Sequence, residues 1–244
     1  FDHDSTSEPM IIDEIFEGEL RKMIVHVSRN GHVYAMDRET GDFLWAGEYT
    51  RVNWALRDES GKPVLKEELY NPASTVVFPG IFGGKNWPPA SYSPDTHMLY
   101  IPTTEWGTTF IRREGEGRPG TMYLGGIPRF EPSGTGYLVA FNMLTGEIEW
   151  QEETPGNFNW AGTLTTGGGL VFSGAADGYL RAYNDETGEV LWEFQTGSGL
   201  YAPPTSFTID GVQYIGIASG TRNPVTRAGV ATGIAPGNYI LFSL

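Results

Sequence analysis

Two aspartates near the beginning of the chain could accept a proton or bind a cation. Asp2 and Asp4 stand two residues apart in the run Phe1-Asp-His-Asp. Carboxylates are anionic proton acceptors at neutral pH and ligands for hard cations, and an extended backbone would turn both side chains to one side. The alternatives are a solvated Asp2 and an ordinary turn, because Asp-x-Asp pairs are common in turns. The spacing alone leaves these interpretations open.

Three further residues could contact a flat or anionic ligand. Arg29, in Ser-Arg-Asn-Gly, carries a fixed guanidinium that can stabilise negative charge, although Asn-Gly is also a strong hairpin signal. Asn86 and Trp87 follow two glycines, which allow the backbone to approach a ligand closely, and an amide can pair with a ligand oxygen. A structural role and a ligand-binding role are compatible for Arg29.

Other familiar chemical motifs are missing or fail in their context. The chain has no cysteine, which excludes a disulfide framework, a thiolate zinc site, an iron–sulfur cluster and a Cys-x-x-Cys-His haem attachment. Nothing resembles a serine nucleophile elbow. The segment 115–120 satisfies G-x-G-x-x-G, but Pro119 lies inside it and neither a strand before it nor a helix after it is predicted. We predict a flexible insertion there. The spacing typical of zinc ligands is not found among the four histidines, His3, His26, His32 and His97.

The charge balance and composition limit the partners and the fold. Over 244 residues, 16 Lys and Arg oppose 30 Asp and Glu, and the net charge of −14 argues against nucleic acid as a partner. Apolar residues make up 39% of the chain, which is enough for a core despite 33 Gly and 16 Pro. No apolar run approaches the roughly 18 to 20 residues of a membrane helix. We expect the start at Phe1 to be internal to a longer polypeptide.

A fifteen-residue pattern occurs three times without gaps. Residues 31–45, 136–150 and 178–192 share G-x-[LV]-x-A-x-[DN]-x-x-T-G-x-x-x-W. The pattern predicts a strand, a four-residue turn closed by Thr-Gly, and a second strand that ends in tryptophan. Because Trp45, Trp150 and Trp192 recur with the repeat, we expect them in the core.

The spacing of the repeats predicts a β-propeller. The second and third repeats begin 42 residues apart, at Gly136 and Gly178, and a propeller blade takes about 40 to 45 residues. The larger gap before the second repeat predicts a degenerate blade that contains residues 90–102 and an insertion loop over about residues 106–134. Further strands are predicted at 22–27, 160–165, 170–173, 201–209, 213–218 and 239–242. We predict an all-β fold of about four blades.

The repeat resembles the tryptophan-docking motif of quinoprotein dehydrogenases, whose tryptophans pack between neighbouring blades of an eight-bladed propeller. Residues 83–94, GGKNWPPASYSP, look like the signature of PQQ-dependent alcohol dehydrogenases, and so do residues 1–13, 28–31 and 159–163. The resemblance implies that residues 1–244 are the C-terminal two-fifths or so of one propeller domain, and that its N-terminal half is a separate chain or a missing segment.

The resemblance also implies roles for the individual residues. Asp2 would be the general base that takes the alcohol proton while hydride passes to PQQ. Arg29 would hold the reactive quinone oxygens, Asn86 and Trp87 would contact the cofactor edge, and Trp160 would be a second cofactor neighbour. Asp2 and Asp4 would bind one metal ion. An acidic residue at position 4 resembles the lanthanide-dependent enzymes, which favours a lanthanide, with calcium as the alternative.

Two functions follow from these patterns. The first is a periplasmic alcohol dehydrogenase that oxidises a primary alcohol to an aldehyde and passes electrons to a c-type cytochrome, with a homodimer also compatible. The second is a non-catalytic propeller scaffold for protein–protein interaction, because scaffolds of outer-membrane assembly carry similar repeats. A scaffold has no need of Asp2, Arg29, Asn86 and Trp160 in these contexts. Which alcohol is used stays open.

Overall fold

The computed structural model describes residues 1–70, 75–113, 115–121, 123, 125–220 and 237–243. Over these residues the fold is all-β, as predicted, with one short 3-10 helix, η1 (Glu67–Tyr70). Three sheets have four antiparallel strands, two have three, and one is a two-stranded hairpin. None of the described residues form a helix long and apolar enough to cross a membrane.

The first sheet contains the first repeat. Its strands follow one another in chain order, β1 (Pro9–Phe16), β2 (Glu19–Val27), β3 (His32–Asp37) and β4 (Phe43–Glu48). Alternate residues such as Val25, Val33 and Ala35 are fully buried and belong to one core cluster with Leu99 and Phe141 of the next large sheet. The period of two in the sequence therefore places one face of this sheet against its neighbour.

The second four-stranded sheet corrects the predicted course of the chain. It contains β8 (Ser91–Ser93), β9 (Met98–Glu105), β12 (Thr135–Asn142) and β13 (Glu147–Thr154), in the order β13-β12-β9-β8. Residues 90–102 were expected to be a blade of their own, but β9 pairs with β12 from Met98↔Asn142 to Glu105↔Thr135. They supply the first two strands of the blade whose last two strands are the second repeat.

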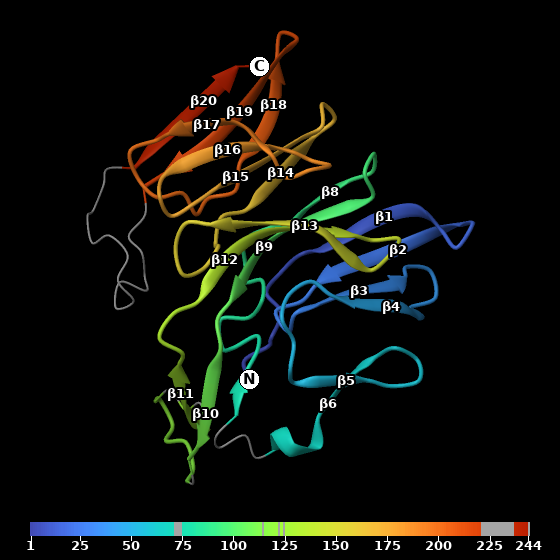
Figure 1. The fold of residues 1–244 in the computed structure, drawn as a ribbon, viewed down its shortest axis with the longest axis vertical. Helices are drawn as coiled ribbons and strands as arrows, with labels where there is room; N and C mark the ends of the chain where they lie inside the picture. Colours follow the sequence, from blue (N-terminus) through green and yellow to red (C-terminus); the bar gives the residue numbers. More distant parts are fainter. Residues whose placement is uncertain (71–74, 114, 122, 124, 221–236, 244) are drawn as a thin grey trace.

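Two more sheets complete the row of blades. One contains β14 (Thr163–Thr166), β15 (Leu170–Gly174), β16 (Tyr179–Asn184) and β17 (Val190–Gln195), and the other contains β18 (Thr205–Ile209), β19 (Val212–Ser219) and β20 (Asn238–Ser243). The first strands of successive sheets contact one another: the Tyr92 hydroxyl donates to Glu14 of β1, and Ser91 Oγ lies 2.9 Å from Thr163 Oγ1. The sheets follow one another as four propeller blades (Figure 1).

Two excursions from the blades lie together at one end of the molecule (Figure 1). The first, between β4 and β8, holds the hairpin β5 (Ala55–Arg57) and β6 (Pro63–Leu65), then η1 and β7 (Val76–Val77). The second lies in the stretch 106–134, which was predicted as a loop. Instead it contains β10 (Thr108–Arg112) and β11 (Gly126–Phe130), which form the sheet β11-β10-β7. Pairing with the first excursion gives this insertion its regular structure.

The repeated tryptophans pack on the following blade, as predicted, but to different degrees. Trp45 stacks on Phe141 with 6.1 Å between ring centroids, and Trp150 donates a 3.0 Å hydrogen bond to the Asp185 carbonyl. Trp192 packs edge-on against Phe242 but is 39% exposed. Trp45 and Trp150 are partly buried, so the burial expected of the three tryptophans is incomplete in each case.

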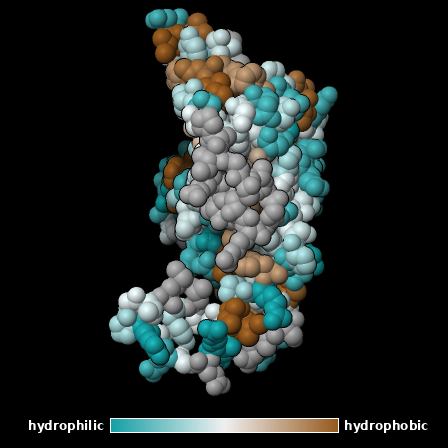
Figure 2. Space-filling view, turned by 90° about the vertical axis from the view of Figure 1, so that its left-hand side faces the viewer, coloured by the Kyte–Doolittle hydropathy of each residue, from teal (hydrophilic) through white to brown (hydrophobic). Residues whose placement is uncertain are grey.

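The first and last blades present apolar side chains to solvent. On the first blade these are Ile11, Ile15 and Leu20, and on the last blade they include Ile209, Tyr239 and Leu241, each at least half exposed. Figure 2 shows hydrophobic residues gathered at the top of the molecule, where Figure 1 places the last blade. Clustered apolar surface of this kind marks an interaction face.

Candidate functional site

The N-terminal segment places Asp2 beside Arg29. The Asp2 Oδ2 atom lies 3.3 Å from Arg29 Nη2, and the neighbouring His3 Nε2 lies 3.0 Å from the Pro79 carbonyl oxygen. Burial lowers the pKa of His3 to about 4, so this imidazole is neutral at pH 7. Arg29 is 27 positions from Asp2 and Pro79 is 76 positions from His3, so contacts with distant residues fix the position of the proposed base.

Arg29 sits in the turn between β2 and β3. Its side chain is only 10% exposed, and Nη2 also donates to the Ile81 carbonyl. Gly83 makes this contact possible, because a Cβ there would lie 2.9 Å from the Arg29 Cβ. The Arg29 Nε atom is buried and has no hydrogen-bond partner among the described residues. One donor of this guanidinium is therefore available to a ligand.

Asn86 organises its own loop. Its Nδ2 donates to the Phe82 carbonyl at 2.9 Å, and its Oδ1 accepts from the Trp87 amide at 2.9 Å. The Trp87 side chain is largely exposed. In this structure the Asn86 amide shapes the segment that the Gly-Gly-Lys-Asn-Trp motif encodes, and its contact with a cofactor stays a prediction.

Trp160 belongs to an aromatic cluster that packs against the same segment. Its ring centroid lies 4.8 Å from that of Phe158 and 6.0 Å from that of Phe82, the latter edge-on. Its Nε1 atom is buried and has no hydrogen-bond partner among the described residues. A buried N–H without an acceptor is costly, so this group also fits a ligand oxygen.

Four predicted residues meet at Ile81 and Phe82, although they are spread over most of the chain. Arg29 bonds Ile81, Asn86 bonds Phe82, Trp160 packs on Phe82, and Asp2 reaches this group through Arg29. The Arg29 Nε and Trp160 Nε1 donors, which have no partner in the part of the chain that the structure describes, suit a planar ligand with acceptor oxygens, such as a quinone. These residues fit part of a quinone site.

The metal-binding expectation finds less support in the geometry. Asp2 has a φ of 61° in place of the extended backbone expected, and its carboxylate is turned to Arg29. Asp4 is exposed. No group of three or more His, Cys, Asp or Glu side chains that could hold a metal occurs in the part of the chain that the structure describes. Asp2 and Asp4 alone do not make a metal site.

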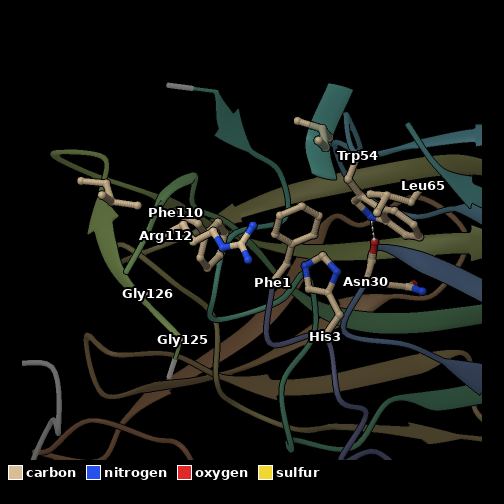
Figure 3. Close-up of a pocket in the computed structure, with 11 residues that line it drawn as sticks. Phe1, His3, Asn30, Trp54, Leu65, Phe110, Arg112, Gly125 and Gly126 are labelled. Carbon is tan, nitrogen blue, oxygen red and sulfur yellow. Dashed lines mark hydrogen bonds between the residues drawn. The ribbon is translucent and has the colours of Figure 1, made fainter. Parts of the chain in front are cut away.

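A pocket next to Asp2 and a buried lysine were not foreseen. The pocket has a volume of about 570 Å³ and is lined by Phe1 and His3, which flank Asp2, and by Trp54, Phe110 and Arg112 from the two excursions (Figure 3). Lys85, inside the Gly-Gly-Lys-Asn-Trp motif, is fully buried. No sequence motif indicates either of them, because both depend on contacts between distant segments.

Comparisons with known proteins agree with this geometry. Residues 122–215 match the sequence model of the PQQ family described as glucose/ethanol/alcohol dehydrogenase, beta-propeller domain. The lanthanide-dependent methanol dehydrogenase of Methylorubrum extorquens is 30% identical over 66% of this chain and 30% of its own length. The quinoprotein ethanol dehydrogenase of Pseudomonas aeruginosa is 34% identical over 66% of this chain and 28% of its own.

Solved structures extend the likeness to the whole chain. A europium-containing methanol dehydrogenase superposes with a TM-score of 0.86 and 27% identity over 100% of this chain and 48% of that one. The quinohemoprotein alcohol dehydrogenase of Comamonas testosteroni gives a TM-score of 0.81 at 32% identity, over 90% of this chain and 35% of that one.

Successive four-stranded sheets with tryptophans docked between them define the chain as part of a β-propeller. The matches identify the propeller more closely. The chain belongs, as a partial chain, to the family of PQQ-type quinoprotein alcohol dehydrogenases. It spans about 30% of the length of the curated relatives that it matches.

Proposed function

We propose that this chain forms part of an enzyme that oxidises a primary alcohol to an aldehyde with PQQ. The observation that carries the proposal is the Asp2–Arg29 pair, together with the Arg29 Nε and Trp160 Nε1 atoms, which are buried and have no hydrogen-bond partner among the described residues. This arrangement offers a proton acceptor next to donors for an oxyanion, which are the two functions that alcohol oxidation needs. The membership of the family supports the choice of cofactor.

Each residue of the site would have its own role in the reaction. When bound, PQQ supplies a carbonyl that accepts hydride from the alcohol carbon. The Asp2 carboxylate accepts the hydroxyl proton, and Arg29 presents its Nε donor where negative charge develops, while its Nη2 holds Asp2. Trp160 and Phe82 supply a flat apolar wall, while Asn86 and Trp87 shape the loop at the edge of the site.

We propose further that Asp2 and Asp4 contribute to a metal site, with a lanthanide favoured over calcium. An additional anionic oxygen from Asp4 favours a trivalent ion of similar size. Because the described residues bring no third ligand to these carboxylates, the remaining ligands must come from elsewhere in the complete protein.

The partners of the complete protein are part of the same proposal. The exposed apolar faces of the first and last blades are suited to the missing blades of an eight-bladed ring, supplied by the rest of the polypeptide or by a second chain. We propose a small alcohol as substrate, a c-type cytochrome as electron acceptor and a periplasmic location. A homodimer is compatible with this arrangement.

Alcohol-dependent dye reduction by the complete protein, reconstituted with PQQ and either lanthanum or calcium, tests the function. We expect Asp2→Ala to lower kcat by at least about 100-fold, because it removes the proton acceptor, and to leave the absorbance of bound quinone largely unchanged. Asp4→Ala should lower the lanthanum-supported rate more than the calcium-supported rate, because the lost charge matters more to a trivalent ion.

Asp210→Ala is the matched control for Asp2→Ala. Asp2 and Asp210 both have a positive φ, of 61° and 50°, but Asp210 lies in the exposed turn between β18 and β19. Its replacement should leave the activity unchanged. A complete protein that binds no quinone would favour the scaffold function, and a full rate in Asp2→Ala would remove Asp2 from the mechanism.

A further inference from the structure

Lys85 is a charged side chain with no exposed surface. Lysine is almost never fully buried unless it is paired, yet the relative exposure of the Lys85 side chain is 0%. Its Nζ lies 3.9 Å from Glu8 Oε1 and 3.5 Å from the carbonyl oxygen of Asn86. Glu8 is therefore the acidic partner of a buried ammonium group and lies in the segment that carries Asp2 and Asp4.

The segment 1–8 has no regular structure and is held by its side chains. Ser5 Oγ lies 2.6 Å from His26 Nε2, and Ser7 Oγ donates to the Val27 carbonyl at 3.0 Å. The contacts of Asp2 and His3 lie toward the beginning of the segment, and Glu8 lies at its end, just before β1. Glu8 thus controls where the segment leaves the first blade.

Lys85 offers a fixed point for this contact because its loop is anchored. The Gly84 amide donates to the Arg29 carbonyl at 2.8 Å, and the Gly84 carbonyl accepts from the Thr104 amide at 2.6 Å. A Cβ at Gly84 would lie 2.8 Å from the Tyr49 hydroxyl, so the loop is closely packed on Tyr49. The same loop therefore holds Arg29 through its backbone and Glu8 through the Lys85 side chain.

We propose that Lys85 is a positioning residue for the site: its buried ammonium group holds Glu8, and thereby keeps segment 1–8 where Asp2 meets Arg29. The consequence for catalysis rests on the proposed function, whereas the effect on the segment does not. The ion pair links the two parts of the site that no strand pairing connects, the N-terminal segment and the loop 80–87.

The charges around Lys85 agree with this role at neutral pH. Burial lowers the pKa of Lys85 to about 8, and the attraction of Glu8 opposes this shift. Burial and the nearby positive charge of Lys85 lower the pKa of His26, while Glu8 opposes that shift too. Burial raises the pKa of Tyr49, which stays a neutral phenol. At pH 7 the Lys85 amine is thus an ammonium group that can pair with Glu8.

A spin label in the segment tests the proposal in the complete protein. This chain has no cysteine, so Thr6→Cys introduces one labelling site into the exposed part of the segment. We expect a restrained nitroxide spectrum in the parent protein. Lys85→Met, which keeps the volume and removes the charge, should raise the mobile fraction several-fold and lower kcat about 10-fold while quinone absorbance is retained.

Two further variants serve as controls for Lys85→Met. Lys85→Arg keeps the positive charge and should restore both the restrained spectrum and most of the activity. Lys22→Met is the matched control, because Lys22 forms a 2.7 Å ion pair with Glu39 on the surface of the first blade. Its spectrum and activity should equal those of the parent. If Lys85→Met does not fold, Glu8→Gln is expected to mobilise the label in the same way.

The results distinguish this proposal from the proposed function. An unchanged spectrum in folded Lys85→Met, or a mobile label in Lys85→Arg, would overturn the positioning role. A mobile label together with unchanged alcohol turnover would confirm that Lys85 holds the segment and would instead remove Asp2 from catalysis.

Discussion

The second and third repeats have the same sequence pattern but differ in the burial of their tryptophan. Trp150 bonds the Asp185 carbonyl at 3.0 Å and packs on the turn of the following four-stranded blade. Trp192 packs on Phe242 of a three-stranded sheet and stays 39% exposed. The repeat therefore encodes only one side of an interface, and the blade that follows determines how much of the indole is removed from water.

Replacing the two tryptophans should show the largest difference. We expect Trp150→Ala to lower the free energy of unfolding by about 3–5 kcal/mol, as for a large side chain removed from a core. Trp192→Ala should cost about 1–2 kcal/mol, because less apolar surface is buried there. Urea unfolding followed by circular dichroism measures both. Equal losses in the free energy of unfolding would contradict the comparison, because they would mean that the two tryptophans have equivalent interfaces with the following blade.

The first repeat differs from the other two because it contains a buried histidine, His32. The His32 side chain is fully buried, and neither ring nitrogen has a hydrogen-bond partner among the described residues. Burial lowers the pKa of His32 to about 4 from 6.5. Between these two pH values the unfolded chain binds more protons than the folded protein, so stability falls as the pH drops from 6.5 towards 4.

The size of this pH effect can be measured with a neutral replacement. A pKa difference of one unit corresponds to about 1.4 kcal/mol, so the loss on acidification should reach a few kcal/mol in the parent protein. His32→Gln should lose less stability between pH 7 and pH 4.5 in the same urea titrations, while His3 continues to contribute. Identical pH dependence in both proteins would contradict the burial argument.

Glycines at equivalent positions of the second and third repeats provide the smallest test. Gly146 and Gly188 both close the turn with a positive φ, of 73° and 76°. A Cβ at Gly188 would lie 2.8 Å from Trp150 Cε3, whereas a Cβ at Gly146 would meet nothing within 4 Å. Gly146→Ala should cost about 1–2 kcal/mol through backbone strain alone.

Gly188→Ala should cost more than Gly146→Ala, because the added methyl group also displaces the docked indole. We expect a further loss of about 1 kcal/mol in urea unfolding and a change in the near-ultraviolet spectrum of Trp150. In the Trp150→Ala background the extra cost should disappear. If it persisted there, contact with Trp150 would not be its cause.

Local repetition made much of the fold predictable. The strand and turn pattern of each repeat reproduces β3–β4, β12–β13 and β16–β17, because alternation and Thr-Gly turns depend on neighbouring residues. The grouping of the strands into blades was harder to predict from the sequence. Strand β9 pairs with β12 across the whole insertion, and no local signal distinguishes this from a separate blade that contains residues 90–102.

The candidate site was predictable only as a set of residues. Family-like motifs identified Arg29, Asn86 and Trp160, and the structure brings them to Ile81 and Phe82. The orientation of Asp2 and the burial of Lys85 were not predictable, because both result from packing between the N-terminal segment and loop 80–87. Spacing in the sequence carries no information about such contacts.

The insertion between β9 and β12 begins and ends at one pair of partner residues in adjacent strands. Glu105 and Thr135 are paired residues of adjacent strands, so everything from 106 to 134 takes the place of a simple hairpin turn. Evolution can lengthen, shorten or exchange this module without shifting the register of the blade. Because Phe110 and Arg112 of the module line the pocket beside Asp2, the propeller can change the shape of that pocket while its framework stays constant.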